Sequence, residues 1–409
     1  MMLSSFFVLM AVAWPAVLAC QQHVQRDAAS LARRTIVKEP ESVILKNVRV
    51  FDGIARLPPS TVYLSSGLIV PFLSPHANAT VIDGAGQDLT LLPGFFDAHA
   101  HPETTADLLS FARNGVTTVM DMACSTRAEC LALVREHADD GLPSVFVSGA
   151  TATVPGSANA NLPGFPANET IATGTREEID SWVQSQLDKG ASYIKLIQDR
   201  PGQLQLSPEE VQTLVNASAS RGLQTNCHVA AYDSVGIAVE AGVSMVHHLP
   251  FDKSIDADLA HSAKRAGTIS VPTLTMMRAF GAILAPGMYD IALESVRTLR
   301  EADVPILAGT DANAVNKLGI PIATLPPPIS FGPSLHDELA NLVEAGLTPL
   351  EALRSATVLP SLHFGLTPDR GAVLPGLRAD LVLVEGDPTK DISVTRNIRK
   401  VWIGGVEVV

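Results

Sequence analysis

The middle of the chain alternates short apolar runs with segments of helical periodicity, and this rhythm restricts the fold more than any other feature. Eight runs have the length of a buried strand, at residues 91–96, 116–120, 144–147, 193–197, 223–227, 244–246, 268–271 and 306–309. Helical patterns occupy residues 176–189, 208–221, 233–241 and 288–302, and Thr175 and Ser207 with Pro208 provide start signals for two of them. Eight strand–helix units over roughly 270 residues predict an α/β fold, a (β/α)₈ TIM barrel spanning residues 91–365.

Both ends of the chain differ from this middle part. Residues 41–90 alternate short apolar runs with Asp-Gly, Ser-Gly and Pro turns, which is typical of a small antiparallel sheet. Residues 379–384 and 401–406 return to the same pattern near the other end. We therefore predict that residues 41–90 and 366–409 pair into one small β-sandwich beside the barrel.

The first residues form an apolar stretch that is too short for a spanning helix, with a small residue at Ala19. This predicts a cleaved signal peptide over residues 1–19 and a secreted protein, although the stretch lacks a preceding Lys or Arg and its Val-Leu-Ala-Cys end loosely resembles a lipoprotein box. Residues 20–40 are either a loose arm or a propeptide. Glycosylation sequons occur at Asn78, Asn168 and Asn216.

Composition narrows the classes of function. The 409 residues are 46% hydrophobic and 17% charged, and the formal net charge is −13, so the chain offers no basic surface for nucleic acid or anionic lipid. Beyond the predicted signal the cysteines are Cys20 at the cleavage point, Cys124, Cys130 and Cys227, which excludes a disulfide framework. Cys124 and Cys130 are close enough in the sequence to pair locally. We expect a compact globular enzyme with a small-molecule substrate and no membrane association after signal removal.

Several polar residues at the predicted strand ends have side chains that can bind a metal ion. His99 and His101 end the first run with a spacing that projects both imidazoles from one strand face, which suits a divalent metal, although two structural histidines would give the same pattern. The later strands add Lys195, His228, His248 and Asp311, and the carboxyl ends of barrel strands meet at one mouth. A lysine inside an apolar strand is costly as an ammonium ion. Carboxylated by CO₂, it would become an anion able to bridge two metals.

Several motifs taken together resemble the amidohydrolase superfamily of binuclear metal-dependent hydrolases, in its imidazolonepropionase-like, prolidase-like and ochratoxinase-like branch. They are Pro-Gly-Phe-Phe-Asp-Ala-His-Ala-His, Tyr-Ile-Lys-Leu-Ile, Cys-His-Val-Ala-Ala-Tyr, Gly-Val-Ser-Met-Val-His-His-Leu-Pro and Ala-Gly-Thr-Asp-Ala, in this order. The resemblance covers nearly everything after residue 41. It implies two divalent ions, with Zn²⁺ as the default for imidazole and carboxylate ligands.

The resemblance also assigns ligands. It implies that His99, His101 and Asp311 hold one metal, that His228 and His248 hold the second, and that carboxylated Lys195 bridges them. His247 competes with His248, but the family pattern favours His248. Strand alternation predicts that His247 points to the opposite face in a structural role.

The resemblance implies attack by a metal-bridging hydroxide, with Asp311 as the residue that takes and returns the proton. Tyr232 matches a tyrosine that contacts the substrate carbonyl in related enzymes; alternatively it is a pocket-lining aromatic. Related dipeptidases carry a histidine after the third strand, where Asn159 stands here as a replacement in substrate binding. His336 either orients a group near the site or has a capping or packing role.

These observations predict a metal-dependent amidohydrolase that cleaves an amide or peptide-like C–N bond. A lactone or ester hydrolase is the first alternative, because the same hydroxide attacks either carbonyl. A non-hydrolytic biosynthetic enzyme such as a decarboxylase is the second, and the lysine argues against it. Relatives often assemble, so a homo-oligomer is left open.

Overall fold

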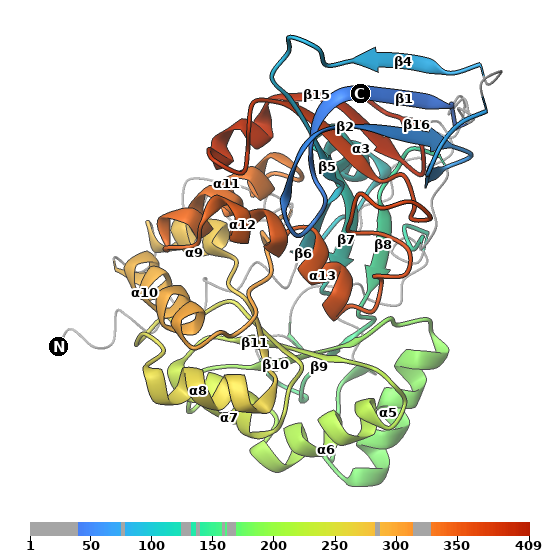
Figure 1. The fold of residues 1–409 in the computed structure, drawn as a ribbon. Coiled ribbons are helices and arrows are strands. Elements are labelled where there is room, and N and C mark those ends of the chain that lie inside the picture. The colour runs from blue at the N-terminus through green and yellow to red at the C-terminus, as the bar shows by residue number, and fades with distance from the viewer. Residues whose placement is uncertain are drawn as a thin grey trace.

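The computed structural model describes residues 40–74, 78–123, 132–135, 140–157, 160–161, 169–282, 287–313 and 329–409 (Figure 1). A mixed sheet lies at one end of the molecule, and parallel strands with their helices form the remainder. The predictions made for residues 1–39, for Asn159, for the Asn168 sequon and for a Cys124–Cys130 pair lie outside the described residues. The side chains of Asn78 and Asn216 are exposed.

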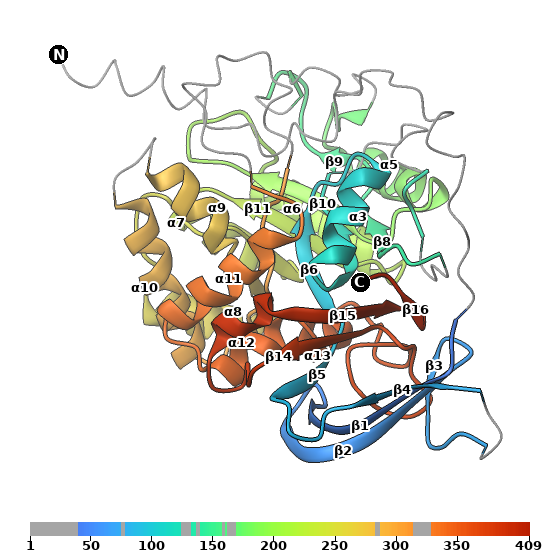
Figure 2. The same cartoon turned by 90° about the horizontal axis from the view of Figure 1, so that it is seen from above.

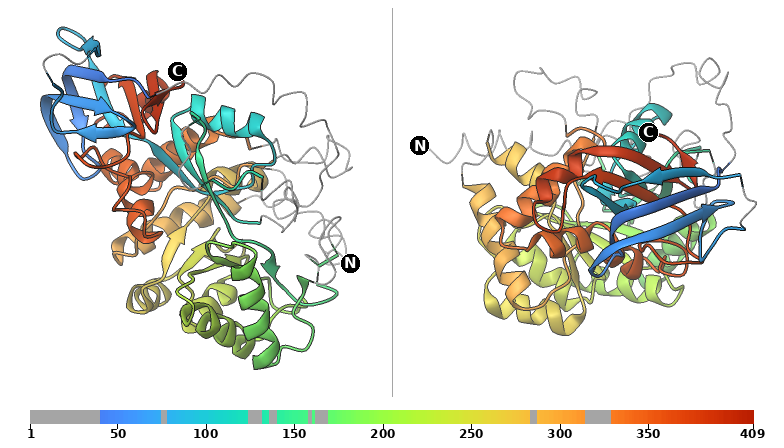
Figure 3. Two further views of the ribbon diagram at one scale, coloured as in Figure 1. Left: turned by 90° about the vertical axis from the view of Figure 1, so that its right-hand side faces the viewer. Right: turned by 45° about the horizontal axis from the view of Figure 1, so that its top comes forward.

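Strands from both ends of the chain build this sheet, as predicted, but residues 43–46 and 49–50 pair in parallel with residues 80–83 and 90–91, so the sheet is mixed and not antiparallel throughout. Within the described ranges its order is β16-β15-β14-β5-β1-β2-β3, and β4 also pairs with β1. The strands are β1 (Val43–Phe51), β2 (Arg56–Ser65), β3 (Leu68–Val70), β4 (Thr80–Asp83), β5 (Leu89–Pro93), β14 (Leu381–Glu385), β15 (Ile398–Ile403) and β16 (Val406–Glu407). The antiparallel pair of β5 with β14 joins the two chain ends. Figure 3 shows this sheet beside the helical part of the molecule.

The remaining described strands are parallel and form two groups, in the orders β6-β7-β8 and β13-β12-β11-β10-β9. They are β6 (Phe95–Ala100), β7 (Val116–Asp121), β8 (Ser144–Val147), β9 (Thr151–Ala152), β10 (Ile194–Gln198), β11 (Thr225–Val229), β12 (Met245–His247) and β13 (Ile269–Val271). Parallel bridges join Ser270 to Ile306 and Ala100 to Ala312, so residues 306–312 lie between β13 and β6. This parallel α/β arrangement is TIM-barrel-like.

Helices follow most of the parallel strands and cover them (Figure 2). They are α3 (Thr105–Arg113), α5 (Arg176–Asp188), α6 (Pro208–Ala219), α7 (Tyr232–Glu240), α8 (Ala257–Ala266), α9 (Leu274–Gly281), α10 (Met288–Glu301), α11 (Pro333–Glu344), α12 (Pro349–Ser355), α13 (Val358–His363) and the 3₁₀ helix η5 (Ile392–Arg396). The predicted caps are confirmed. Thr175 accepts from the N–H of Glu178, and Ser207 forms a capping box with Glu210.

Two expectations about the elements were wrong, and one helix was not predicted. The run at residues 91–96 belongs to two strands, because the chain passes from β5 to β6 at Gly94, where a Cβ atom would lie 2.2 Å from Thr117 Oγ1. The helix that was not predicted is α9, in which the side chains of Met276, Met277 and Phe280 are buried in the core. Residues 306–309 form an isolated bridge to β13 in place of a regular strand.

The core divides between the two parts of the fold. One large apolar cluster lies between the parallel strands and their helices, and a smaller one fills the mixed sheet around Leu45, Leu91 and Trp402. The buried Arg370 links the parts, because its guanidinium faces the carboxylate of Asp380, directly before β14, and donates to Thr118 Oγ1 on β7. Among the described residues, no helix combines the length and apolar character needed to span a membrane.

Candidate metal centre

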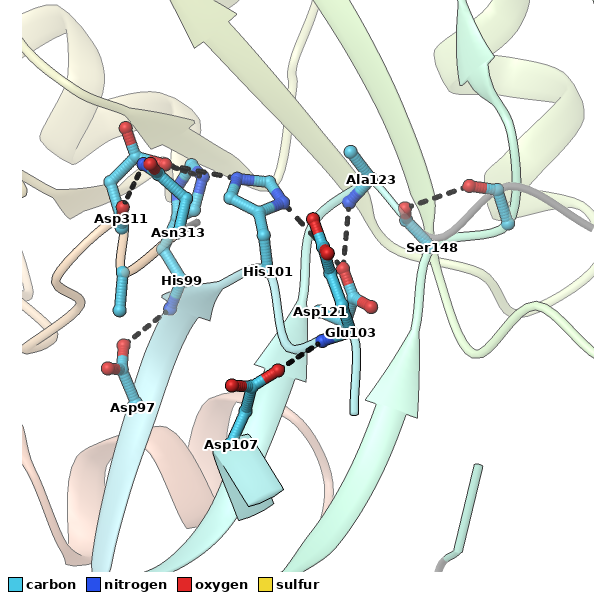
Figure 4. Close-up of polar contacts among 12 residues, drawn as sticks. Asp97, His99, His101, Glu103, Asp107, Asp121, Ala123, Ser148, Asp311 and Asn313 are labelled. Carbon is cyan, nitrogen blue, oxygen red and sulfur yellow. Dashed lines mark hydrogen bonds and ion pairs between the residues drawn. The ribbon is translucent and has the colours of Figure 1, made fainter. Parts of the chain in front are cut away.

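Three buried side chains converge at the carboxyl end of β6. His101 Nε2 lies 3.0 Å and His99 Nε2 3.4 Å from Oδ1 of Asp311, and the three side chains are almost completely buried. Figure 4 shows the two imidazoles and the carboxylate facing one another. Their ligand atoms lie within 4.8 Å of one another, which suits one divalent cation held by two imidazoles and a carboxylate.

Backbone contacts fix this convergence. Gly309 passes so close to β6 that a Cβ atom there would lie 2.9 Å from His99 Cβ. The N–H groups of Thr310 and Asp311 then donate to the carbonyl of His99, and Asp311 adopts a φ of 60°. Asp97 holds the same turn, because its carboxylate accepts from the N–H and the hydroxyl of Thr310. Asp311 therefore reaches the histidines through a turn that costs conformational energy in a non-glycine residue.

Two further histidines lie beside this group. The ring centroid of His248 is 4.8 Å from that of His99 and 4.5 Å from that of His228. His248 follows the last residue of β12 with a φ of 68°, and its Nδ1 lies 2.8 Å from Thr273 Oγ1. The five predicted histidine and aspartate ligands thus form one cluster.

Lys195 lies on β10, in register with Asn226 on β11, two residues before His228. Its side chain is buried, and no hydrogen-bond partner for Nζ is found within the described ranges. Burial lowers the pKa of Lys195 to about 8, although the nearby carboxylate of Asp311 opposes this shift. A buried lysine that loses its proton near neutral pH is a nucleophilic amine.

The imidazoles have distinct electrostatic surroundings. Burial lowers the pKa of His99, His228 and His248 well below the usual value, and the charge of Lys195 acts in the same direction. Burial also opposes the charged form of His101, but Asp121 and Asp311 raise its pKa to about 9. His101 Nδ1 lies 3.7 Å from Asp121 Oδ1, so a carboxylate faces each of its nitrogens. Neutral imidazoles are the form that binds metals.

His247 does not point away from the cluster, and the alternation argument was wrong here. Its Nδ1 lies 2.9 Å from Nδ1 of His99, and its Nε2 lies 2.8 Å from Oδ1 of Asn226. Within β12 the side chain of His247 follows the direction of Met245, and the positive φ of His248 brings the next ring back to the same group. Both histidines of the pair therefore lie at the site.

The other predicted site residues have partners of their own. The hydroxyl of Tyr232 donates to Asp256 at 2.7 Å, so contact with a substrate carbonyl requires this bond to exchange. His336 is buried between Phe95 and Thr395, with its Nδ1 3.0 Å from Thr395 Oγ1, which fits the packing alternative. The roles proposed for both residues stay predictions.

The sequence reasoning did not single out Asp121, Asn226 and Thr273, which contact the histidines. Asp121 had a readable signal, because it is a carboxylate at the carboxyl end of a buried strand. Asn226 likewise stands two residues before His228 on the same strand face.

Residues 90–408 match the model of the amidohydrolase family. The chain is 24% identical over 370 residues to ochratoxinase from Aspergillus niger, covering 77% of this chain and 75% of that protein. It is 29% identical over 208 residues to imidazolonepropionase from Deinococcus deserti, covering 49% of this chain and 46% of that protein. A crystal structure of a Xaa-Pro dipeptidase matches with a TM-score of 0.74 at 22% identity, covering 90% of this chain and 99% of that one, and shows likeness of fold. The branch predicted from the motifs is confirmed, and the chain belongs to the amidohydrolase family.

Proposed function

We propose that the protein is a binuclear metal-dependent hydrolase that cleaves an amide or peptide-like C–N bond in a small molecule. Family membership supports a hydrolase of amide-type bonds. The observation that carries the proposal is the convergence of His99, His101 and Asp311 beside a buried lysine and two more histidines. Two divalent ions, with Zn²⁺ as the expected metal, suit these donors.

The donor set fits two cations better than one. Asp311 Oδ2 and Lys195 Nζ are both buried, and neither finds a hydrogen-bond partner in the described part of the chain. Unpartnered buried polar atoms are costly unless a further group satisfies them. When the Lys195 amine attacks CO₂, a C–N bond forms, one proton leaves and the side chain becomes an anionic carbamate. That anion would supply oxygen donors for the ions.

When bound, the cations would lower the pKa of a coordinated water and polarise the substrate carbonyl. Side chains of the protein carry out the remaining steps. Asp311, held by its turn with Oδ1 facing both imidazoles, accepts the proton of the attacking water and delivers it to the leaving nitrogen. The buried surroundings exclude bulk water and strengthen each electrostatic contact. Tyr232, at the start of α7, is the candidate donor to the developing oxyanion.

We also infer that the two groups of parallel strands are parts of one (β/α)₈ barrel. Residues 306–312 bridge β13 and β6, and the N–H of Ser192 donates to the carbonyl of Val147 between β8 and β10. Such a barrel would gather the carboxyl ends of β6, β11 and β12 at one mouth, where the proposed histidine ligands lie, with Lys195 of β10 deeper in the barrel beside Asn226.

The proposed function is tested with zinc-reconstituted enzyme on a panel of amino-acid amides, dipeptides and N-acyl amino acids, together with matched esters and lactones. We expect cleavage of at least one amide, loss of cleavage in the apoenzyme and in Asp311→Asn, and unchanged cleavage in the control Asp337→Asn on the exposed side of α11. Cleavage of esters and lactones alone, or amide cleavage that persists in the apoenzyme, contradicts the proposal.

A further inference from the structure

One contact at the centre joins two imidazoles directly. Nδ1 of His99 lies 2.9 Å from Nδ1 of His247, with the ring centroids 4.8 Å apart, and both side chains are almost completely buried. A hydrogen bond between two such nitrogens needs one proton, on one side only.

The second nitrogen of His247 decides which ring carries that proton. Nε2 of His247 lies 2.8 Å from Oδ1 of Asn226, and the Asn226 side chain is fully buried. An amide oxygen only accepts, so His247 carries its proton on Nε2 and offers a lone pair on Nδ1. His99 must then donate from its own Nδ1, which leaves the lone pair on His99 Nε2.

That lone pair points where a cation is expected. His99 Nε2 is the nitrogen that faces Asp311 Oδ1, beside His101 Nε2. The reversed Asn226 amide would place the proton of His99 on Nε2 and close this position. We propose that His247 and Asn226 are positioning residues that hold His99 in the tautomer able to bind the metal, an inference that rests on the proposed metal-dependent function.

Two of the other imidazole ligands, those of His101 and His248, do not depend on such a relay. Nδ1 of His101 faces the carboxylate of Asp121, which accepts whenever it is ionised, and Nδ1 of His248 faces the hydroxyl of Thr273. His99 differs, because the group that accepts from its Nδ1 is the imidazole of His247, which accepts only when its own proton is on the other nitrogen. Asn226 therefore acts on the metal two hydrogen bonds away, from β11 through β12 to β6.

The test measures metal affinity. Apoenzyme is titrated with Zn²⁺ against a chromogenic chelator for the wild type, His247→Phe, Asn226→Leu and the double variant. We expect each single variant to bind the tighter Zn²⁺ about 10- to 100-fold more weakly, as is usual for groups that orient a ligand. The double variant should bind like His247→Phe alone, because Asn226 acts only through His247.

Ser270→Ala is the matched control, because Ser270 is another buried polar residue and lies on the neighbouring strand β13. The Ser270→Ala variant should bind Zn²⁺ with the affinity of the wild type. If the wild type itself binds no Zn²⁺, the proposed function fails. The relay is refuted if the wild type binds Zn²⁺ and both single variants bind it as tightly as the wild type. It is also refuted if the double variant loses affinity by the sum of the two single losses of binding free energy.

A second measurement needs no variant and therefore does not depend on folding of the substituted chains. Two-bond ¹H–¹⁵N correlations in histidine-labelled, zinc-loaded wild type read the tautomer of each ring. We expect a proton on Nδ1 of His99 and on Nε2 of His247. The opposite assignment at either ring overturns the inference.

Discussion

Carboxylation of Lys195 should follow the fraction of this side chain that is an uncharged amine. Burial lowers its pKa from 10.5 to about 8. At a pH below both values, this difference of about 2.5 raises the amine fraction about 300-fold over an ordinary lysine. About one molecule in ten then carries the reactive amine at pH 7, and about half do at pH 8.

The assay follows recovery of bound Zn²⁺ by the apoenzyme from pH 6 to pH 10, at a fixed concentration of dissolved CO₂ so that the bicarbonate equilibrium does not distort the profile. The initial rate should rise with pH and reach half of its maximum at about pH 8. Lys195→Ala should show no dependence on CO₂, whereas Lys390→Ala, which removes an exposed lysine, should behave like the wild type. A half-maximum near 10.5, or a wild-type rate that ignores CO₂, refutes the reasoning.

Three further predictions concern the surroundings of the centre. Thr273→Val removes the acceptor for His248 Nδ1 and should weaken binding of one Zn²⁺ about 10-fold by chelator competition, whereas Thr273→Ser should not; equal losses contradict the contact. Burial raises the pKa of Glu338 to about 8, so the folded state binds the extra proton and the free energy of unfolding should fall as pH rises from about 4.5 to 8. Glu338→Gln should make the free energy of unfolding, measured by urea titration, depend less steeply on pH. An unchanged dependence on pH would contradict the raised pKa of Glu338. Arg370→Met should lower the free energy of unfolding by about 3–5 kcal/mol, and the exposed control Arg399→Met by less than about 1 kcal/mol; similar losses would contradict the buried linkage.

Local sequence signals identified most regular elements correctly. The run at residues 144–147 coincides with β8, and the Ser207-Pro208 signal marks the start of α6. These signals are short-range, because apolar periodicity and capping act within a few residues. The pairing of both chain ends in one sheet could also be predicted, because turn residues separate the strands and the same pattern occurs at both ends.

Elements that depend on contacts with distant residues could not be predicted from the sequence. α9 begins at Leu274 without a side-chain cap from Thr273; instead the carboxylate of Glu338 on α11 accepts from the N–H groups of Leu274 and Thr275. No local pattern announces a cap supplied from more than 60 residues away. The break at Gly94 likewise depends on contact with Thr117 of the neighbouring strand.

The proposed histidine and aspartate ligands could be predicted because each stands at or near the carboxyl end of a strand, where the topology brings them together, whereas Lys195 was recognised as a charged residue inside the apolar strand β10. Their orienting partners could not, since Asp121, Asn226 and Thr273 act through contacts between strands. The direction of His247 was misjudged because alternation fails at His248, whose φ of 68° lies outside the strand region.

The central claim is that this cluster holds two cations. The most direct measurement is the metal content per chain of protein purified from a zinc-supplemented host, by elemental analysis alongside Lys195→Ala. The account predicts about two equivalents of Zn²⁺ in the wild type and loss of metal in the variant. About one equivalent or fewer in the wild type would contradict it.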